Sequence, residues 1–252
     1  MIDLKGKTIL VTGGSRGIGE AIVQAVAEAG ARVLLHYGRR RDAAEAIQAS
    51  IGKAACQLLQ ADLGETAAAD ALWRAASAAV PRIDALINNA GIFEPAPVDA
   101  PMDKWHDAWS RVMQVNLYAP ADLCKLAIAH FRAHGGGKII NVASRAAHRG
   151  DAPDQWPYAA SKGALVAMTK TIARGYARDN VLAFTIAPGF TDTEMAYTGL
   201  DDAGIKRILA EIPLGTMASA EECGALAAFL CTDNVRHLTG ATFDINGASY
   251  VR

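Results

Sequence analysis

The sequence has few cysteines and no long apolar segment. Four cysteines, Cys56, Cys124, Cys223 and Cys231, are spread over 252 residues without a Cys-x-x-Cys pair. That spacing favours reduced, buried thiols over a disulfide framework or a zinc site. No apolar run approaches the roughly 20 residues that a membrane-spanning helix needs. We therefore expect a soluble, cytoplasmic protein that holds no metal and does not bind a membrane.

An excess of charge of either sign is also absent. The chain carries 25 lysine and arginine residues against 26 aspartate and glutamate residues, a formal net charge of -1. A nucleic-acid binder would normally show a clear basic excess, so no nucleic-acid partner is expected. No linker, internal repeat or low-complexity segment divides the chain, and its 51% hydrophobic content is ample for one core. We expect residues 1–252 to form a single domain.

Short apolar runs alternate with alanine-rich helical segments along almost the whole chain. Residues 8–12 (TILVT), 32–37 (RVLLHY) and 55–62 (ACQLLQAD) are each followed by a helical pattern, and similar runs begin at residues 83, 138 and 182. This alternation predicts an α/β fold with a doubly wound parallel sheet and helices on both faces. Ligands bind such sheets beyond the carboxyl ends of the strands, so we expect the functional residues there.

A glycine-rich turn follows the first predicted strand. Residues 12–19 read TGGSRGIG and place Gly13, Gly17 and Gly19 where the strand gives way to a helix. Glycine permits unusual backbone angles and lets main-chain N–H groups approach a phosphate at the positive end of the helix. An ordinary turn is the alternative, but the position between a first strand and an amphipathic helix favours a nucleotide site.

A tyrosine and a lysine stand four residues apart in the segment QWPYAASKGAL, residues 155–165. In a helix this spacing puts Tyr158 and Lys162 on one face, and Pro157 suits the first helical turn. An ammonium beside a phenol favours the phenolate, so we expect Lys162 to lower the pKa of Tyr158. A chance pairing on a helix remains the alternative at this point.

Four segments together resemble the short-chain dehydrogenase/reductase family. They are TGGSRGIG at 12–19, NNAG at 88–91, YAASK at 158–162 and APG at 187–189, and they occur in the family's order. The match spans the chain and includes the closing LTGATFDING; within the family it is similar to the 3-oxoacyl carrier-protein reductases. The resemblance implies a Rossmann-type fold, a nicotinamide cofactor and, most often, a homotetramer.

The resemblance also assigns four catalytic positions. Tyr158 would exchange the proton while hydride passes between the nicotinamide and a carbonyl carbon, and Lys162 would contact the nicotinamide ribose. Ser144 matches the serine that hydrogen-bonds the substrate oxygen. Asn116 matches the asparagine that helps to hold a water near the lysine. Independently, Pro120 has no N–H for the carbonyl of residue 116, which leaves that carbonyl free for a water; a simple helix kink is the alternative.

The identity of the nicotinamide cofactor depends on the end of the second predicted strand. An NAD enzyme is expected to carry an acidic residue there, whereas this chain has His36 and Tyr37 followed by three arginines at 39–41. Arg16, inside the glycine-rich turn, is at a position that is often basic in NADP-preferring relatives, and guanidinium groups suit a phosphate dianion. We expect NADP(H), with Arg16 as the phosphate ligand; the arginines at 39–41 can equally be a solvated helix start.

The remaining cofactor positions follow from the same motifs. Asp62 resembles the acidic residue that contacts the adenine, the NNAG segment passes the ribose, and the segment after APG resembles the loop that holds the nicotinamide carboxamide. The predicted cofactor-binding residues are Gly13, Ser15, Arg16, Gly17, Ile18, Gly19, Tyr37, Arg39, Asp62, Leu63, Asn89, Ala90, Gly91, Tyr158, Lys162, Pro188, Gly189 and Thr191.

Substrate recognition is expected in residues 93–101, 145–157 and 190–206, because loops dominate specificity in this architecture. His148, Arg149 and Trp156 could recognise a polar or acidic substrate or could form a solvated loop. Ketones, steroids, sugars and 3-oxoacyl thioesters stay open as substrates. Two further patterns concern structure: His130 and His134 are interpreted as basic residues at a helix C-terminus and not as metal ligands, and Phe184 and Ala248 replace the family's usual asparagine and glycine.

Two functions are compatible with these features. The first is an NADPH-dependent oxidoreductase that transfers hydride between nicotinamide and a ketone or secondary alcohol, with Tyr158 as proton donor or acceptor. The second is a catalytically silent NADP(H)-binding sensor or scaffold. The presence of all four catalytic residue types favours the enzyme, because a silent protein would be free to lose them.

Overall fold

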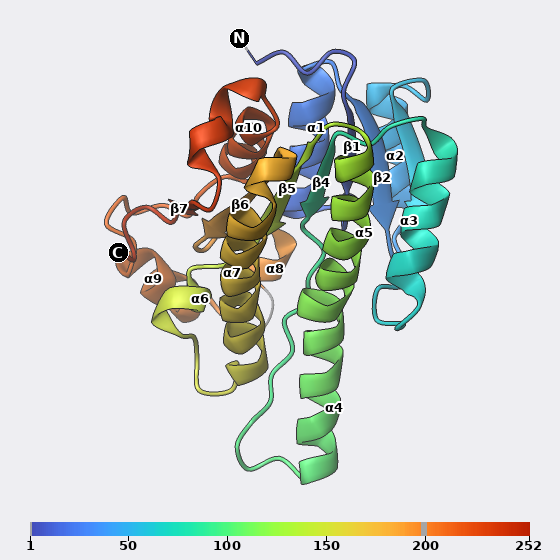
Figure 1. Cartoon of the computed structure of the whole chain (residues 1–252). Helices are drawn as coiled ribbons and strands as arrows, with labels where there is room; N and C mark the ends of the chain where they lie inside the picture. The colour runs from blue at the N-terminus through green and yellow to red at the C-terminus, as the bar shows by residue number, and fades with distance from the viewer. Residues whose placement is uncertain (1, 198–200) are drawn as a thin grey trace.

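Residues 2–197 and 201–252 of the computed structural model build a seven-stranded, wholly parallel sheet with helices on both faces (Figure 1). The strand order is β3-β2-β1-β4-β5-β6-β7. This confirms the predicted Rossmann-type α/β fold. The strands are β1 (Thr8–Val11), β2 (Arg32–Tyr37), β3 (Cys56–Gln60), β4 (Ala85–Asn88), β5 (Gly137–Val142), β6 (Val181–Pro188) and β7 (Thr242–Ile245).

The helices lie where the alanine-rich segments predict them. The principal ones are α1 (Gly17–Glu28), α2 (Arg41–Ile51), α3 (Ala68–Ala79), α4 (Met102–Met113), α5 (Ala119–Ala133), α7 (Trp156–Tyr176), α9 (Asp202–Ala210) and α10 (Ala220–Leu230). Shorter turns are α6 (Ala146–Arg149), α8 (Glu194–Tyr197), the π-helix η1 (Gln114–Tyr118) and the 3₁₀ helices η2 (Ala177–Asp179) and η3 (Asp233–Leu238).

Both faces of the sheet are buried, which explains why its strands are apolar throughout. Side chains alternate across a strand. On β1, Ile9 and Val11 therefore join the core under α1, α2 and α10, whereas Leu10 joins the core under α3, α5 and α7. All three side chains are fully buried. Consecutive apolar residues of one strand thus pack alternately against the helices on the two faces of the sheet.

The order of the strands creates a topological switch point at the carboxyl ends of β1 and β4. β1 pairs with β2 on one side and with β4 on the other, so the connections from these strands leave in opposite directions. Ligands bind open parallel sheets at this switch point. The glycine-rich turn follows β1, the NNAG segment follows β4 and Ser144 follows β5, so all three lie at the same edge of the sheet.

The helix at Asn116 is widened into a π-helical turn. η1 continues α4 and leads directly into α5, so that the three form the long rod at the front of Figure 1. The N–H of Ala119 donates to the carbonyl of Gln114, which is a π-type bond, and Pro120 follows with no N–H to donate. The irregularity at Pro120 is therefore a π turn and not only a kink.

Several structural expectations can be compared directly with the fold. All four cysteines are buried and free, which confirms the predicted thiols. Phe184 is fully buried in the core, and Ala248 takes a φ of 64°, the left-handed region in which glycine is favoured.

None of the helices in the described residues is long and apolar enough to cross a membrane.

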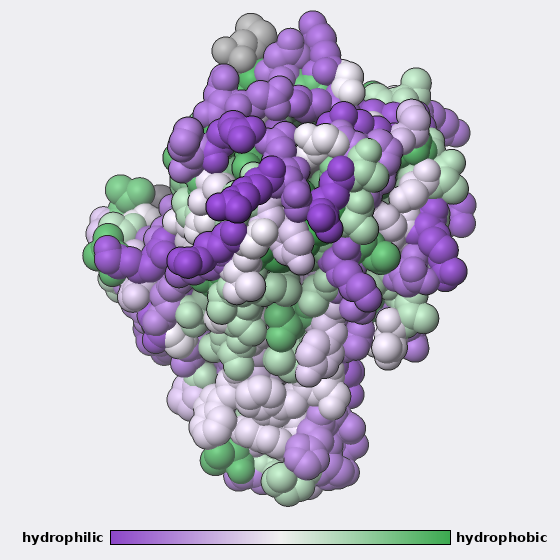
Figure 2. All heavy atoms as spheres, in the orientation of Figure 1, coloured by the Kyte–Doolittle hydropathy of each residue, from purple (hydrophilic) through white to green (hydrophobic). Residues whose placement is uncertain are grey.

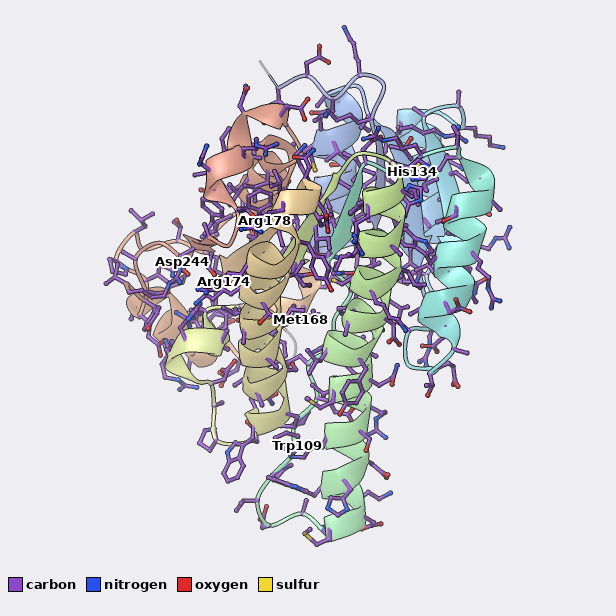
Figure 3. All side chains as sticks on the ribbon, in the orientation of Figure 1. Trp109, His134, Met168, Arg174, Arg178 and Asp244 are labelled. Atoms are coloured by element: carbon purple, nitrogen blue, oxygen red, sulfur yellow. The ribbon has the colours of Figure 1, made fainter. Side chains whose placement is uncertain are left out.

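His130 differs from its expected role as a basic residue. Its Nε2 accepts a hydrogen bond of 3.0 Å from the N–H of Ile83, and burial lowers the pKa of its ring. The residue therefore joins α5 to the start of β4 as a hydrogen-bond acceptor. His134 stacks on it with ring centres 4.0 Å apart, and Figure 3 shows His134 at the upper end of α5.

The surface is divided by hydropathy. On the face drawn in Figure 2, apolar and weakly polar side chains gather over α5 and α7, and strongly hydrophilic side chains border them above. Met168 lies on α7 (Figure 3) and packs partly against two apolar clusters of the core. The helical layer formed by α5 and α7 therefore has an apolar outer side as well as an apolar inner side.

The packing of α10 on α1 depends on a glycine and gives a first prediction. A Cβ at Gly224 would lie 2.6 Å from the main-chain oxygen of Ala21, which is closer than any relaxed contact. We expect Gly224→Ala to lower the free energy of unfolding by about 1–3 kcal/mol through overpacking. A Cβ at Gly175 on α7 would meet no other described atom within 4 Å, so Gly175→Ala should leave stability unchanged or raise it by about 0.5 kcal/mol. Denaturant unfolding of both variants measures this, and equal stabilities would contradict it.

Candidate active site

The tyrosine, the serine and the lysine meet at the start of α7. Pro157 occupies the first turn of α7 as expected, Tyr158 follows it, and the side chain of Ser144, just after β5, lies near enough to the Tyr158 phenol to act on its pKa. Lys162 lies one turn further along, with its Nζ 5.7 Å from the centre of the Tyr158 ring. Nζ donates a 2.9 Å hydrogen bond to the carbonyl of Val142, the last residue of β5. Three side chains predicted to act together are thus neighbours.

Burial moves the pKa values of the tyrosine and the lysine in opposite directions. Loss of solvent raises the pKa of Tyr158 to about 12, although the side chain of Ser144 acts to lower it. Loss of solvent also lowers the pKa of Lys162 to about 8. The net shift is therefore upward, because desolvation of the phenol outweighs the other contributions, and the predicted lowering by Lys162 does not determine this pKa. At neutral pH, Tyr158 keeps its proton and can act as a proton donor.

Asn116 fixes the position of the lysine and tyrosine through a buried amide. Its Oδ1 accepts from the N–H of Ile92 at 2.8 Å, and its Nδ2 donates to the carbonyl of Ile92 at 3.0 Å and to Ser161 Oγ at 3.2 Å. Ser161 in turn donates to the carbonyl of Tyr158 at 2.7 Å. The amide therefore connects η1, the segment after β4 and the first turn of α7.

Gly91 lies where these groups converge. A Cβ at this position would stand 3.4 Å from both Asn116 Oδ1 and Lys162 Nζ. The absence of a side chain leaves room beside the lysine at the carboxyl end of β4. The NNAG segment thus passes beside Asn116 and Lys162, and its contact with a ribose stays a prediction.

The glycine-rich turn packs tightly against the same segment. Gly13 has a φ of 64°, and a Cβ on it would lie 2.9 Å from the Cα of Ala90. A Cβ on Gly19 would lie 2.0 Å from the oxygen of Gly13. Asn89 donates through Nδ2 to the carbonyls of Thr12 and Gly13, each at 3.1 Å. Contacts within the protein therefore leave no room for a side chain at Gly13 or Gly19.

Thr12 is a residue of the site that the sequence analysis did not identify. Its hydroxyl oxygen accepts hydrogen bonds of 3.0 Å from the N–H groups of both Asn89 and Ala90. The hydroxyl proton points to the carbonyl of Ile87 at 3.4 Å. A threonine directly before the glycines was the available signal, because a hydroxyl at the end of β1 can reach the turn that follows β4.

His36 is a second unidentified residue of the site. Its Nδ1 accepts a 3.1 Å hydrogen bond from the N–H of Gly13, and its Nε2 lies 3.0 Å from the carbonyl of Ala61. The neutral tautomer with the proton on Nε2 satisfies both partners. Burial lowers the pKa of His36 to about 4, so the ring is neutral at physiological pH. The imidazole joins the ends of β1, β2 and β3.

Tyr37 does not present its side chain as expected. It is 4% exposed and packs in the apolar core with Val23 of α1 and Ala44 of α2. The reason is the alternation of β2: the ring turns toward the helical layer and not toward the crevice. Ser15 is buried in the glycine-rich turn, and Ile18 packs against the same core.

The arginines near the adenosine end are distributed over different partners. Arg16 and Arg40 both bond to the carboxylate of Glu194 on α8, at 3.3 Å and 2.9 Å. Arg39 pairs instead with Asp62 at 3.4 Å. Arg41 pairs with Glu45 one turn along α2, as a solvated helix start would. Arg40, which the sequence analysis did not choose as a ligand, is thus the arginine that accompanies Arg16.

Asp62 and Leu63 follow the end of β3. One carboxylate oxygen of Asp62 accepts from the N–H of Gly64 at 3.0 Å, which shapes the turn. Leu63 is buried, and its carbonyl accepts from Gln114 Nε2 at 3.4 Å. Both residues therefore lie at the adenosine side of the crevice with their main chain held in place.

The loop after β6 is held by three contacts. The N–H of Arg145 donates to the carbonyl of Pro188 at 2.8 Å. A Cβ on Gly189 would lie 2.8 Å from the Cβ of Asn246, so no side chain fits there. Thr191 is 4% exposed, and its hydroxyl donates to the carbonyl of Gly189 at 3.4 Å. This loop lies beside Ser144, where the nicotinamide end is expected.

Arg145 contacts the loop after β6 and is a further residue that the motifs did not indicate. Its guanidinium is 4.6 Å from the centre of the Phe190 ring and donates to Ser249 Oγ at 2.6 Å. The side chain is 8% exposed and also faces Glu211 at 3.6 Å. Its contacts join the segments after β5, β6 and β7.

Aromatic side chains lie next to Tyr158 and along the start of α7. Phe93, which is 47% exposed, contacts the Tyr158 ring edge-on with centres 5.0 Å apart. This places the start of the predicted segment 93–101 at the reacting group. Trp156 is half exposed and contacts Trp105 of α4 at 5.4 Å, and Trp109 lies between α4 and the lower end of α7 in Figure 3.

His148 and Arg149 are engaged with other parts of the protein. The His148 ring stacks parallel to Tyr250 with centres 6.1 Å apart, and Arg149 pairs with Glu211 at 3.2 Å. Their contacts match the structural alternative better than direct substrate recognition. Within the predicted segment 190–206, residues 198–200 lie outside the described residues.

The crevice has the features that a nicotinamide dinucleotide requires. Among the described residues, no side chain caps the N-terminus of α1, so its N–H groups are directed at the glycine-rich turn. Arg16 and Arg40 provide cationic groups beside the glycine-rich turn, and Tyr158 and Lys162 lie at the start of α7. The parallel sheet, the glycine-rich turn and this crevice define a dinucleotide-binding α/β protein.

Comparison with known proteins identifies the family. A family model described as enoyl-(acyl carrier protein) reductase matches residues 13–248. The chain is 34% identical to nodulation protein G of Rhizobium sp. (strain N33), over 98% of both chains. It is 35% identical to 3beta-hydroxysteroid dehydrogenase 1 of Eggerthella lenta, over 97% of this chain and 94% of that one. It is 32% identical to a 3-oxoacyl-[acyl-carrier-protein] reductase of Escherichia coli, over 99% and 100%.

Solved structures agree with these relatives. A putative NAD(P)-dependent gluconate 5-dehydrogenase from Beutenbergia cavernae with bound NADP superposes with a TM-score of 0.90 at 32% identity, over 98% of each chain. A putative short-chain alcohol dehydrogenase from Sinorhizobium meliloti gives 0.91 at 31% identity, over 98% of each. The chain belongs to the short-chain dehydrogenase/reductase family and is an NAD(P)-dependent oxidoreductase, as the motifs indicate.

Because the lowered pKa of His36 keeps its ring neutral in the fold, we expect the free energy of unfolding to depend on pH. Its pKa falls from 6.5 in the unfolded chain to about 4 in the fold, so the unfolded state binds more protons between these values and stability decreases as pH falls from 6.5 to 4. The loss approaches about 3 kcal/mol for this one group. His36→Gln should flatten the slope of unfolding free energy in this window, whereas the exposed His106→Gln should retain it. An unchanged slope in His36→Gln would contradict the assignment.

Proposed function

We propose that this oxidoreductase uses NADPH to reduce a ketone to a secondary alcohol, with Tyr158 as the proton donor. The observation that carries the proposal is the position of Lys162 and Ser144 beside the Tyr158 phenol: Lys162 Nζ lies 5.7 Å from the ring centre, and Ser144 is near enough to act on the pKa of the phenol. A phenol with a pKa of about 12 is protonated at neutral pH, which suits a donor. Bound nicotinamide would supply the hydride to the carbonyl carbon, or accept it in reverse.

Ser144, Tyr158 and Lys162 would have different roles in stabilising the charge that develops on the carbonyl oxygen. Ser144 offers its hydroxyl to that oxygen and orients it against Tyr158, which donates its proton as negative charge develops. Lys162 keeps most of its charge at pH 7 because its pKa is about 8, and this charge stabilises the tyrosinate that remains. Asn116 holds the lysine side of the site through Ile92 and Ser161. The π turn before Pro120 supports the proposed water beside Asn116.

The arginines support NADP(H) as the preferred cofactor. Arg16 and Arg40 face one another across a single carboxylate, so both guanidinium groups can reach one anion. The end of β2 carries neutral His36 where an NAD enzyme is expected to carry a carboxylate. A 2′-phosphate is a dianion that suits two guanidinium groups.

The substrate class follows from Phe93 and Trp156, which are both about half exposed near Tyr158. We propose a substrate with an apolar portion next to its carbonyl group, in keeping with the aromatic ring that contacts Tyr158. A homotetramer and a cytoplasmic location stay predictions, and the apolar face over α5 and α7 supports self-association.

Tyr158→Phe tests the proton donor. We expect kcat for ketone reduction to fall by about 10²- to 10⁴-fold, while the Kd for NADP⁺ stays close to that of the parent chain, because the ring remains. Tyr176→Phe, at the far end of the same helix, is the control and should keep full turnover. A panel of ketones, 3-oxoacyl thioesters and sugars supplies the substrates. Cofactor binding without turnover of any of them would favour the sensor or scaffold function, and full activity of Tyr158→Phe would refute the donor.

The cofactor preference is measured by kcat/KM with NADPH and NADH on one substrate. We expect NADPH to be preferred by at least about tenfold, the effect of about 1.4 kcal/mol from contacts between guanidinium groups and phosphate. Arg16→Gln should reduce this preference mainly through the KM for NADPH. A higher kcat/KM for NADH in the parent chain would overturn the assignment.

A further inference from the structure

The two arginines of the adenosine side already bind an anion that belongs to the chain itself. Glu194 Oε2 lies 3.3 Å from Arg16 Nη1 and 2.9 Å from Arg40 Nη1, and Glu194 Oε1 accepts from Arg40 Nη1 at 3.1 Å. Glu194 is 178 residues from Arg16 and 154 from Arg40 in the sequence. The carboxylate therefore connects the segment after β6 to the glycine-rich turn and to the start of α2.

The segment that carries Glu194 also lies directly on the glycine-rich turn. A Cβ at Gly17 would stand 3.1 Å from Thr193 Cγ2, so the residue before Glu194 touches the first residue of α1. The base of the segment is fixed, because Thr191 bridges to Ala218 and the N–H of Asp192 donates to the carbonyl of Ala218 at 2.9 Å. α8 thus covers the turn at which the phosphates of a dinucleotide are expected.

From this arrangement we infer that Glu194 is a specificity-determining residue: its carboxylate occupies the 2′-phosphate position between Arg16 and Arg40 and is displaced when a 2′-phosphorylated nucleotide binds. The inference rests on the proposed NADP(H) function. A carboxylate and a phosphate present the same kind of acceptor oxygens to a guanidinium fork. The phosphate carries the larger charge, so it competes successfully for the two arginines.

The exposure of the three side chains makes the exchange reversible. The side chains of Glu194, Arg16 and Arg40 are 61%, 49% and 50% exposed. Ion pairs at this exposure are weak and are screened by salt. Glu194 therefore acts as a replaceable occupant and not as a permanent block. Its displacement also removes the two ion pairs between α8 and these arginines, so binding of the phosphate is coupled to the contacts of the segment after β6.

NAD(H) lacks the group that would replace the carboxylate. With NAD(H) in the crevice, both arginines keep Glu194 as their partner, and no competition for them arises. Removal of the carboxylate should consequently strengthen the binding of 2′-phosphorylated nucleotides and leave other adenine nucleotides unaffected. This selective gain distinguishes an occupant of the phosphate position from a residue that merely orients the arginines, since loss of an orienting residue would weaken binding.

Calorimetry with adenosine 2′,5′-bisphosphate, 5′-AMP, NADP⁺ and NAD⁺ tests the inference without turnover. We expect Glu194→Gln to lower the Kd for adenosine 2′,5′-bisphosphate and NADP⁺ about three- to tenfold, the effect of releasing two exposed ion pairs. The Kd values for 5′-AMP and NAD⁺ should stay unchanged. Glu211→Gln is the matched control, because Glu211 also faces two arginines, Arg145 and Arg149, and its own side chain is 52% exposed. It should alter none of the four values.

Arg40→Gln completes a double-mutant cycle. The gain from Glu194→Gln should shrink in the Arg40→Gln background, since one of the two contested guanidinium groups is gone. In the unmodified chain, hydrogen exchange at the main-chain amides of residues 194–197 should become faster with adenosine 2′,5′-bisphosphate and not with 5′-AMP. This readout applies even if a variant does not fold.

The outcomes separate the inference from the proposed function. If the parent chain binds NADP⁺ more tightly than NAD⁺ but Glu194→Gln leaves the bisphosphate Kd unchanged or raises it, the role of Glu194 is overturned and the proposed function stands. Unchanged or slower exchange in residues 194–197 overturns it equally. If the parent chain binds neither dinucleotide, the proposed function itself fails.

Discussion

Parallel pairing of β1 with β4 and of β4 with β5 determines where the functional groups lie. Strands that run in one direction end at one edge, so the glycine-rich turn, the NNAG segment and Ser144 are placed side by side although more than a hundred residues separate the first from the last. α7 begins at the same edge and carries Tyr158 and Lys162 in its first turns. The carbonyl of Val142 at the end of β5 holds the lysine there.

The same burial that stabilises this edge also sets its chemistry. A desolvated phenol holds its proton, with a pKa of about 12, and a desolvated ammonium releases its proton more easily, with a pKa of about 8. Both pKa values are therefore shifted in the direction opposite to the one that a simple ion pair between phenolate and ammonium would give. A protonated phenol and a nearby lysine with a lowered pKa result from loss of solvent and not from direct contact alone.

The neutral polar residues of the crevice have a structural role that the charged ones do not. Thr12, Asn89 and His36 bond the ends of β1, β2, β3 and β4 to each other through main-chain groups. Because these bonds are partly buried, breaking one leaves a polar group with reduced access to water. The arginines at the adenosine side, in contrast, lie in solvent, where their partners can change. The strand ends are thus held together by hydrogen bonds of neutral side chains, whereas the arginines beside them form solvent-exposed ion pairs.

The sequence by itself determined the layers of the fold, the glycine-rich turn and the common helix of Tyr158 and Lys162. These features depend on local periodicity: alternating faces of buried strands, glycine backbone angles and an i, i+4 spacing. The tertiary structure alone decided that Glu194 lies between Arg16 and Arg40, that His36 accepts from Gly13, that Tyr37 turns into the core, and that the pKa of Tyr158 rises. Each of these depends on contacts between residues distant in sequence or on the amount of solvent that packing removes, and neither quantity is encoded in a local pattern.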